Sequence, residues 1–421
     1  MLLDRSQLRN FYDQVVNDFH SLRKTVHILV NPNVDGLCSQ IMLTNLLQSD
    51  SVPYTVHYIQ SKSKLLQVLS STSPSSGSDS DSDSDSSPAE DPGVGALDPV
   101  KSMRSRRDKI VSYYNQGTCH SYPTSYVMLH LTGSSRFSGD AGMLWMAMVG
   151  SSSCLQEGKI DVEGWREIAA GLERERDGRT QVQTSQRGNI VREAEFRFCL
   201  LSSWSLYDAM YYSNYVSSRM SCFKGRGEAK LKEMLAKMGV PLDEAKQSWA
   251  FMKPEFRKKV KAMIHEYKEE YGLPDVEVEG FKMVTGFNST VSSSDVALAV
   301  RGILDTGALG GSAGASAVAE AVDSLLVGGG SAEEGSTLAT LVNGGNVGGR
   351  GISRGIALAK TDRVKVMEAA VGMVEKSEIV AYKHFRFAYI HATGIGANGG
   401  VKGNGRAGTA EKDKENDNGG R

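Results

Sequence analysis

The sequence predicts an α/β protein in which a parallel sheet is followed by a largely helical region. Near the start of the chain, the apolar segment Val26–Val30, the turn-forming residues 31–36, a helical segment 37–47 and the apolar residues 54–59 follow one another. Strand, turn, helix and strand in this order form a βαβ unit, which implies a parallel sheet. Farther along, residues 196–304 contain three helical stripes, one alternating segment and a fourth helical stripe, which predict an αααβα region.

Residues 196–252 contain clear signals for where helices begin and end. One helix face is formed by Leu231, Met234, Leu235 and Met238. Gly239 and Pro241 follow and are typical of a helix end. This stretch has no histidine and no close pair of cysteines, so its residues favour a packing or docking module over a catalytic site.

The remaining elements are less regular. Residues 126–131 and 143–149 are expected to form two short apolar helices. Residues 156–189 are expected to form an irregular or partly disordered polar insertion, with weak helical character around Trp165–Leu172. The alternation in residues 276–284 predicts a strand, and its change of phase at Gly280 predicts a bulge. The S-x-x-D pattern of 292–295 predicts a capping box for the next helix.

The C-terminal third is rich in glycine. Within the Gly/Ala/Ser-rich residues 305–351 we expect a flexible insertion with a short helix at 315–326. Ser353 is expected to cap a long helix, and residues 385–391 alternate as a strand. The segment 344–351 lacks the Lys-Ser/Thr of a phosphate-binding loop and follows no strand, so a nucleotide site is not expected there.

Composition narrows the class of protein. The 421 residues carry a formal net charge of −1, which gives no global attraction to nucleic acid or membranes. The five cysteines are scattered, and the two closest, Cys199 and Cys222, are 23 residues apart, which argues against a zinc ribbon and favours a reducing compartment. No apolar run is long enough for a membrane span and no signal peptide is apparent, so we expect a soluble intracellular protein.

These patterns divide the chain into eight parts, and each boundary is an expectation. An N-terminal α/β part (1–70) and the remainder of the same domain (101–155) flank an acidic Ser/Asp linker (71–100). A polar insertion (156–189) precedes the helical interaction module with its strand (190–304). A Gly-rich insertion (305–352), the start of a C-terminal domain (353–392) and a disordered tail (393–421) complete the chain.

Two sets of residues are candidate sites on the sequence alone. Asp35 lies just beyond the first predicted strand, where α/β sheets bind ligands, so it is either a metal-site or phosphate-site carboxylate or a cap of the following helix. In the acidic linker, Ser78, Ser80, Ser82 and Ser84 are each followed by Asp and are candidates for acid-directed phosphorylation. The alternative for the linker is a solvated spacer.

Several ordered blocks resemble the family of cell-division-cycle protein 45. The strongest are WSLYDAMYYSNYVSSRM (204–220) and GRGEAKLKEMLAKMGVPLDEAKQSWAFM (225–252). Further similar blocks are NVDGLCS (33–39), YYNQGTCHSYPTS (113–125), MLWMAMVG (143–150) and GFNSTVSSSDVALAV (286–300). These blocks lie between residues 33 and 300 and follow one another in the family's order.

The resemblance implies a fold related to the DHH phosphoesterases, which include the RecJ exonucleases, with an N-terminal parallel-sheet domain, a helical insertion and a C-terminal α/β domain. It implies a nuclear, non-catalytic subunit of the eukaryotic replicative helicase. The implied partners are the minichromosome-maintenance ring, the GINS complex and origin or fork chromatin, and no cofactor or metal is implied. In that family the helical insertion docks against partner subunits.

The rival interpretation is an active single-strand phosphoesterase or exonuclease of the DHH type. Two-metal hydrolysis needs several Asp and His ligands around ions about 4 Å apart. Asn33 stands where those enzymes usually have a second Asp before Asp35, and residues 151–153 are serines where a later Asp would follow. No Asp-His-His motif occurs in the sequence, so the resemblance implies that Asp35 is a vestigial metal position.

Partner contacts are expected from exposed residues of the helical module. The candidates are Trp204, Tyr207, Tyr211, Tyr212 and Arg219, which are interface residue types. The alternative is that these aromatic residues belong to the core. Single-stranded DNA is a further candidate partner, because Lys224, Arg226 and Lys230 could meet phosphates, although a solvated helix face is the favoured explanation for them.

The family pattern has further sheet strands where this sequence continues into the acidic linker after residue 70, and a C-terminal domain where this sequence has a Gly-rich tail after His391, so we expect both domains to be incomplete. A sheet without its central strands is expected to be unstable by itself.

Overall fold

A computed structural model describes residues 5–22, 25–59, 62–72, 122–133, 141–180, 189–284, 290–306, 312–326, 348–376, 379–381 and 386–388. The chain forms two compact units, residues 1–362 and 363–421. The acidic linker with its four candidate serines and the Gly-rich tail lie outside the described residues. Among the described helices, none has the combination of length and apolar character needed to cross a membrane.

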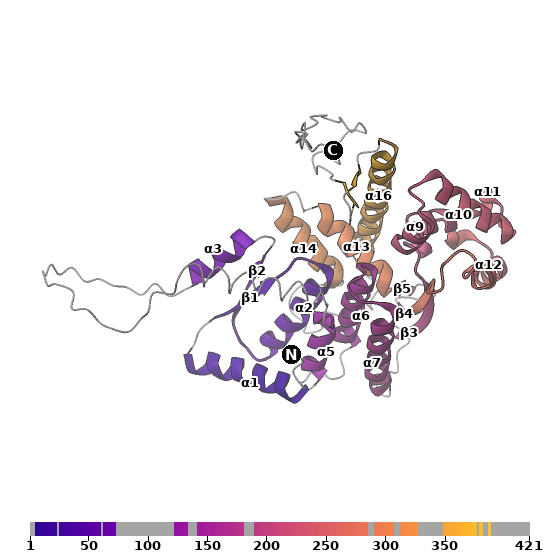
Figure 1. Ribbon diagram of the computed structural model, residues 1–421. Coiled ribbons are helices and arrows are strands. Elements are labelled where there is room, and N and C mark those ends of the chain that lie inside the picture. Colours follow the sequence, from indigo (N-terminus) through magenta and orange to yellow (C-terminus); the bar gives the residue numbers. More distant parts are fainter. Residues whose placement is uncertain are drawn as a thin grey trace, which may run out of the picture. The chain divides into compact units, whose positions relative to one another are not determined.

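The expected βαβ unit is present at the start of the first unit (Figure 1). Strands β1 (Val26–Val30) and β2 (Tyr54–Tyr58) pair in parallel, with Val26 opposite Tyr54. Helix α2 (Val34–Ser49) connects them, and α1 (Arg5–Leu22) and α3 (Lys62–Thr72) flank the unit in sequence. Helix α2 begins three residues earlier than expected because the side chain of Asn33 caps it, accepting the Gly36 N–H at 2.6 Å.

Three further helices pack with this unit into one apolar core. They are α5 (Thr124–Gly133), α6 (Ala141–Gln156) and α7 (Val162–Thr180). Residues 142–155 of α6 are all buried, which explains why its sequence shows no polar face. The expectation of an irregular chain around 156–189 is wrong for α7, because Trp165, Ile168 and Leu172 bury one side of this otherwise charged helix in the core.

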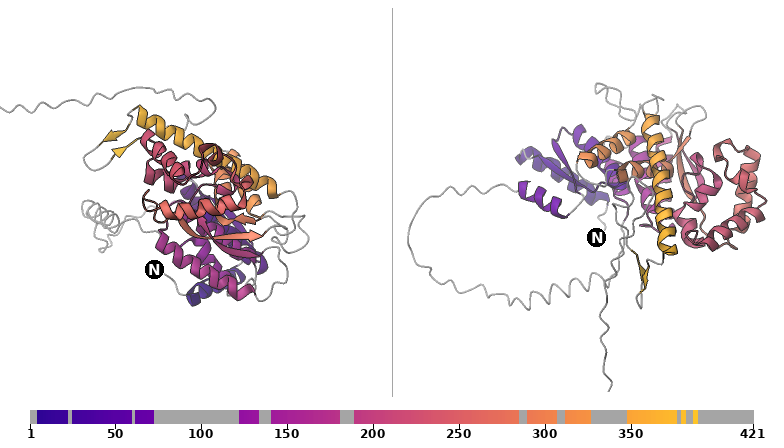
Figure 2. Two further views of the ribbon diagram at one scale, coloured as in Figure 1. Left: turned by 90° about the vertical axis from the view of Figure 1, so that its right-hand side faces the viewer. Right: turned by 90° about the horizontal axis from the view of Figure 1, so that it is seen from above.

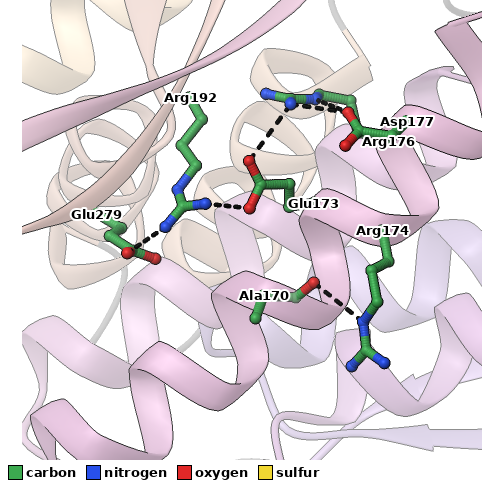
Figure 3. Close-up of polar contacts among 7 residues, drawn as sticks. All are labelled: Ala170, Glu173, Arg174, Arg176, Asp177, Arg192 and Glu279. Atoms are coloured by element: carbon green, nitrogen blue, oxygen red, sulfur yellow. Dashed lines mark hydrogen bonds and ion pairs between the residues drawn. The ribbon is translucent and has the colours of Figure 1, made fainter.

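Helix α7 is also tied to a second sheet by polar contacts (Figure 3). Arg192 of β3 forms ion pairs with Glu173 of α7 and with Glu279 of β4. The indole N–H of Trp165 donates to the main-chain carbonyl of Glu279 at 2.9 Å. These contacts hold the charged side of the helix against the sheet while its apolar side faces the core.

The second sheet is antiparallel, with strand order β3–β4–β5. The strands are β3 (Ile190–Phe196), which the sequence did not predict as a strand, β4 (Glu277–Val284) and β5 (Thr290–Ser292). The expected bulge at Gly280 is wrong, since the register runs unbroken from Ile190 opposite Met283 to Phe196 opposite Glu277. Gly280 instead leaves room for a side chain of the neighbouring strand, because a Cβ at this position would lie 2.5 Å from the side chain of Glu195.

The helical module connects β3 to β4 and consists of short helices that lie next to one another beside β3–β5 (Figure 1). Its elements are η1 (Leu201–Ser203), α8 (Leu206–Tyr211), α9 (Asn214–Met220), α10 (Gly225–Lys237), α11 (Leu242–Ala245), η2 (Trp249–Phe251) and α12 (Pro254–Tyr267). Leu231, Met234, Leu235 and Met238 are buried as expected. Gly239 ends the helix with φ +66°, a conformation that L side chains rarely adopt.

Helices α13 (Ser293–Thr306), α14 (Ser312–Leu326) and α16 (Gly348–Glu375) follow, and Figure 2 shows the gold α16 beside the orange helices. The expected short helix within the Gly-rich insertion is confirmed as α14. Helix α16 begins at Gly348, so the expectation that Ser353 caps it is wrong. Gly355 explains part of the Gly-rich composition: a Cβ there would lie 2.4 Å from the carbonyl oxygen of Ala299 in α13, so the helices approach closely.

The start of α13 differs from a capping box. Ser292 accepts the Ser294 N–H at 3.1 Å and so caps the helix. The carboxylate of Asp295 does not complete the motif, because it accepts a hydrogen bond from the Ser202 hydroxyl of η1. Asp295 therefore links two elements instead of closing its own helix end.

In the second unit, strands β6 (Val380–Ala381) and β7 (Arg386–Phe387) pair in an antiparallel ladder. The expected strand at 385–391 is confirmed for residues 386 and 387, and its last residues lie outside the described chain.

Candidate functional site

Asp35 lies in the first turn of α2, directly after β1, where ligand-binding carboxylates of parallel sheets are found. Its side chain is 9 % exposed. One carboxylate oxygen accepts the N–H of Thr124 and the other accepts the N–H of Ser125, both at 2.9 Å. These two groups are the first N–H groups of α5, which have no partner within their own helix.

Asp35 is therefore an N-terminal cap, but of a helix 89 residues farther along the chain. The sequence offered capping of the following helix as the alternative to a ligand site. That helix, α2, is capped by Asn33 instead. A carboxylate at the positive end of the α5 dipole gains electrostatic stabilisation as well as hydrogen bonds.

The surroundings of Asp35 are closely packed. A Cβ at Gly150 of α6 would lie 2.4 Å from the Ser125 hydroxyl and 3.1 Å from the Asp35 carboxylate, so α5, α6 and α2 meet with no space to spare. Burial, and then the neighbouring Asp35 carboxylate, raise the pKa of the Cys38 thiol well above its ordinary value. Burial and Asp35 also raise the pKa of Cys154 to about 12, so neither sulfur is a thiolate at neutral pH.

This arrangement does not fit a two-metal phosphoesterase centre. Both oxygens of Asp35 are already engaged by backbone N–H groups, and Asn33 caps α2. Ser152 bonds the Ser293 hydroxyl at 2.9 Å, and Ser153 donates to the Gly150 carbonyl at 2.7 Å. Among the residues that the structure describes, no three His, Cys, Asp or Glu side chains gather as metal ligands would.

The second candidate site, in the helical module, is an aromatic cluster. Trp204 and Tyr212 stack with ring centroids 5.0 Å apart and planes inclined by 7°, and Tyr211 meets Tyr212 edge-on at 5.0 Å. All three side chains are half-buried. The ammonium group of Lys360 in α16 lies 5.6 Å from the Trp204 ring, which adds a cation–π contact.

The expectation that Tyr207 is exposed is wrong, because only 8 % of the residue is accessible. Its hydroxyl donates to the Glu228 carboxylate at 3.0 Å, and burial followed by this hydrogen bond raises its pKa above the ordinary value. Arg219 is exposed, with its guanidinium 5.7 Å from the Tyr215 ring. Thus Trp204, Tyr211, Tyr212 and Arg219 are accessible in part, whereas Tyr207 supports the cluster from within.

Sequence reasoning missed the partners of Asp35. Thr124 and Ser125 follow Pro123, and a Thr/Ser pair after proline is a helix-start signal, but nothing in it points to a carboxylate 89 residues away.

The fold and the site define a class of α/β protein in which a helical module is inserted between β3 and β4 and the carboxylate at the end of β1 is a helix cap. The family model named CDC45 matches residues 96–395. The chain belongs to the CDC45 family.

Curated relatives agree with this assignment. The cell division control protein 45 homolog of Schizosaccharomyces pombe is 33 % identical over 228 residues, covering 50 % of this chain and 35 % of that protein. The human homolog is 27 % identical over 234 residues, covering 53 % of this chain and 41 % of that protein. The matches thus span about a third to two fifths of the relatives' length.

A solved structure has the same fold. The crystal structure of CDC45 from Entamoeba histolytica superposes with a TM-score of 0.65 at 16 % identity, covering 89 % of this chain and 75 % of that one. This likeness confirms the α/β fold class expected from the sequence.

Proposed function

We propose that this chain acts as a non-catalytic subunit of the eukaryotic replicative helicase in the nucleus, in the initiation of DNA replication and in fork unwinding. In this role it binds the minichromosome-maintenance ring and GINS. The observation that carries the proposal is that Asp35, the carboxylate at the position where related phosphoesterases hold metal, has both oxygens engaged as the cap of α5. An enzymatic role would need that carboxylate to be available.

The helical module supports a docking role. It presents Trp204, Tyr211 and Tyr212 as a pre-stacked, half-buried cluster, so little side-chain entropy would be lost on binding. Aromatic residues and arginine dominate the energetics of protein interfaces, and Arg219 belongs to the same module. We assign partner binding to this cluster and a supporting role to Tyr207.

Capture of helicase subunits tests the proposal. The purified full chain, immobilised and exposed to nuclear extract, is expected to retain ring subunits and GINS. Replacing Trp204 and Tyr212 by alanine should remove that retention, whereas Phe11→Ala, which truncates a 63 % exposed ring on α1, should not. Circular dichroism establishes that both variants are folded. Retention of neither complex by the unchanged chain would refute the helicase role.

The rival function is a DHH-type single-strand exonuclease, and it has its own test. Incubation with manganese and single-stranded DNA should give no turnover. DNA cleavage by the unchanged chain that disappears in Asp35→Ala would instead support the exonuclease function.

Phosphorylation of Ser78, Ser80, Ser82 and Ser84 stays a prediction, since these residues lie outside the described chain. Mapping of phosphorylation sites in the native protein tests this prediction, and the finding that all four serines are unmodified would refute it.

A further inference from the structure

The corner between η2 and α12 presents a large aromatic ring to solvent. Phe251 is 88 % exposed, whereas its neighbours Trp249 and Met252 are each 7 % exposed. The exposure is not a consequence of a loose backbone. The Trp249 N–H donates to the Trp204 carbonyl at 2.9 Å, and the Phe251 N–H donates to the Ser248 carbonyl at 3.0 Å. Two buried side chains and these hydrogen bonds hold the ring outward in one place.

Basic residues follow Phe251 closely in the sequence. Lys253 follows Phe251 by two residues, and Arg257 and Lys258 lie in the first turns of α12. Within the part of the chain that the structure describes, none of the three forms an ion pair with a carboxylate. Lys261, one turn beyond Arg257 on the same side of the helix, is by contrast paired with Glu193 at 3.7 Å.

The buried face of α12 explains why these cations are not needed for folding. Val260 and Ile264 are fully buried and fix the orientation of the helix. Lys258 is exposed and Arg257 half-buried at the edge of that face. The helix would therefore pack equally well with neutral residues at both positions, so their charge is available for a partner.

We propose that Phe251, Lys253, Arg257 and Lys258 form a docking surface for an acidic peptide segment of a partner protein that carries a bulky apolar residue. We call these four residues the η2–α12 surface. The apolar residue covers the Phe251 ring, and the flanking carboxylates pair with the cations. Partner carboxylates meeting unpaired cations gain complementarity without first breaking an internal ion pair.

A short acidic peptide fits this surface better than a nucleic acid strand does. Nucleic acid binding needs a continuous basic track along the phosphate backbone and stacking for successive bases. Here the exposed carboxylates Glu255 and Glu266 of α12 interrupt the basic residues, so the helix offers no continuous basic track. A peptide can place its few charges beside the cations alone.

The inference is independent of helicase assembly and is tested with purified full chain. The probe is a fluorescein-labelled peptide in which Asp and Glu residues flank a Phe-Leu pair, followed by fluorescence anisotropy. A peptide with Ala-Ala in place of Phe-Leu and a thymidine oligonucleotide serve as comparison probes.

Binding of the Phe-Leu peptide is expected to weaken at least about tenfold in Phe251→Ala and in the double variant R257E/K258E, as for the central residues of an interface. Two matched controls should bind unchanged: Leu66→Ala, which removes a 57 % exposed apolar side chain on α3, and Arg174→Glu, which reverses an exposed charge on α7. Binding that none of the surface variants weakens overturns the proposal. Absence of peptide binding overturns it too, as does oligonucleotide binding through the same residues in preference to the peptide.

Discussion

Replacing Asp35 by alanine tests whether this carboxylate serves folding or metal chemistry. The side chain accepts two backbone N–H groups of α5 at 2.9 Å while being 9 % exposed. A hydrogen bond to a charged group contributes about 1.5–3 kcal/mol, and a buried N–H left without a partner costs about 1–3 kcal/mol. We expect Asp35→Ala to lower the free energy of unfolding by about 3 kcal/mol, and Asp35→Asn, whose amide oxygen can still accept one N–H, by less.

An exposed cap elsewhere in the chain is the matched control. Asp161 accepts the Gly164 N–H at 2.8 Å at the start of α7, within one helix and at the surface. Asp161→Ala should cost about 1 kcal/mol, the usual value of a local cap. Denaturant unfolding followed by tryptophan fluorescence measures all three variants against the unchanged chain.

Addition of manganese to the same unfolding experiment separates the two roles of Asp35. A metal that binds the folded chain raises the unfolding midpoint. We expect no shift that depends on Asp35. A loss in Asp35→Ala no larger than in Asp161→Ala, together with a manganese-dependent stabilisation that this variant abolishes, would refute the capping argument.

Three further changes have definite expected outcomes. Burial, and then the nearby Asp295 carboxylate, raise the pKa of Glu195 from its ordinary value of 4.5 to about 7. The protonated carboxyl therefore contributes stability that is fully present below pH 4.5 and is lost as the pH rises through 7. Glu195→Gln should remove this loss, which is at most about 3 kcal/mol, in unfolding curves at pH 5 and pH 8. Arg192→Met should destabilise by about 1–3 kcal/mol, because Glu173 and Glu279 are left together without their cation; added salt should reduce the penalty. Gly355→Val should lower the melting temperature and speed proteolysis of α16, since its Cβ would meet the Ala299 carbonyl, whereas Gly372→Ala, in open space, should not.

The corrections to the sequence predictions share one physical cause. The sequence favours an irregular chain for α7 because thirteen of its nineteen residues are polar, charged or glycine, and a local pattern reflects that majority. Its buried side chains, the ion pair of Glu173 with Arg192 of β3 and the hydrogen bond from Trp165 to Glu279 of β4 decide the outcome, and these partners are distant in sequence. At Gly280 the close neighbour is likewise a residue distant in sequence, Glu195 of the neighbouring strand.

The sequence by itself determined the α/β class, the parallel β1–α2–β2 unit, the punctuation of α10 and the family, because hydrophobic period, caps and ordered motifs are local properties of the chain. Only the tertiary structure decided what Asp35 does, since the N–H groups it caps belong to residues 124 and 125. Tertiary structure alone also separated the buried Tyr207 from the exposed Phe251. The burial of a side chain and its hydrogen-bond partners depend on which elements are in contact in the folded protein, and local sequence patterns do not specify these contacts.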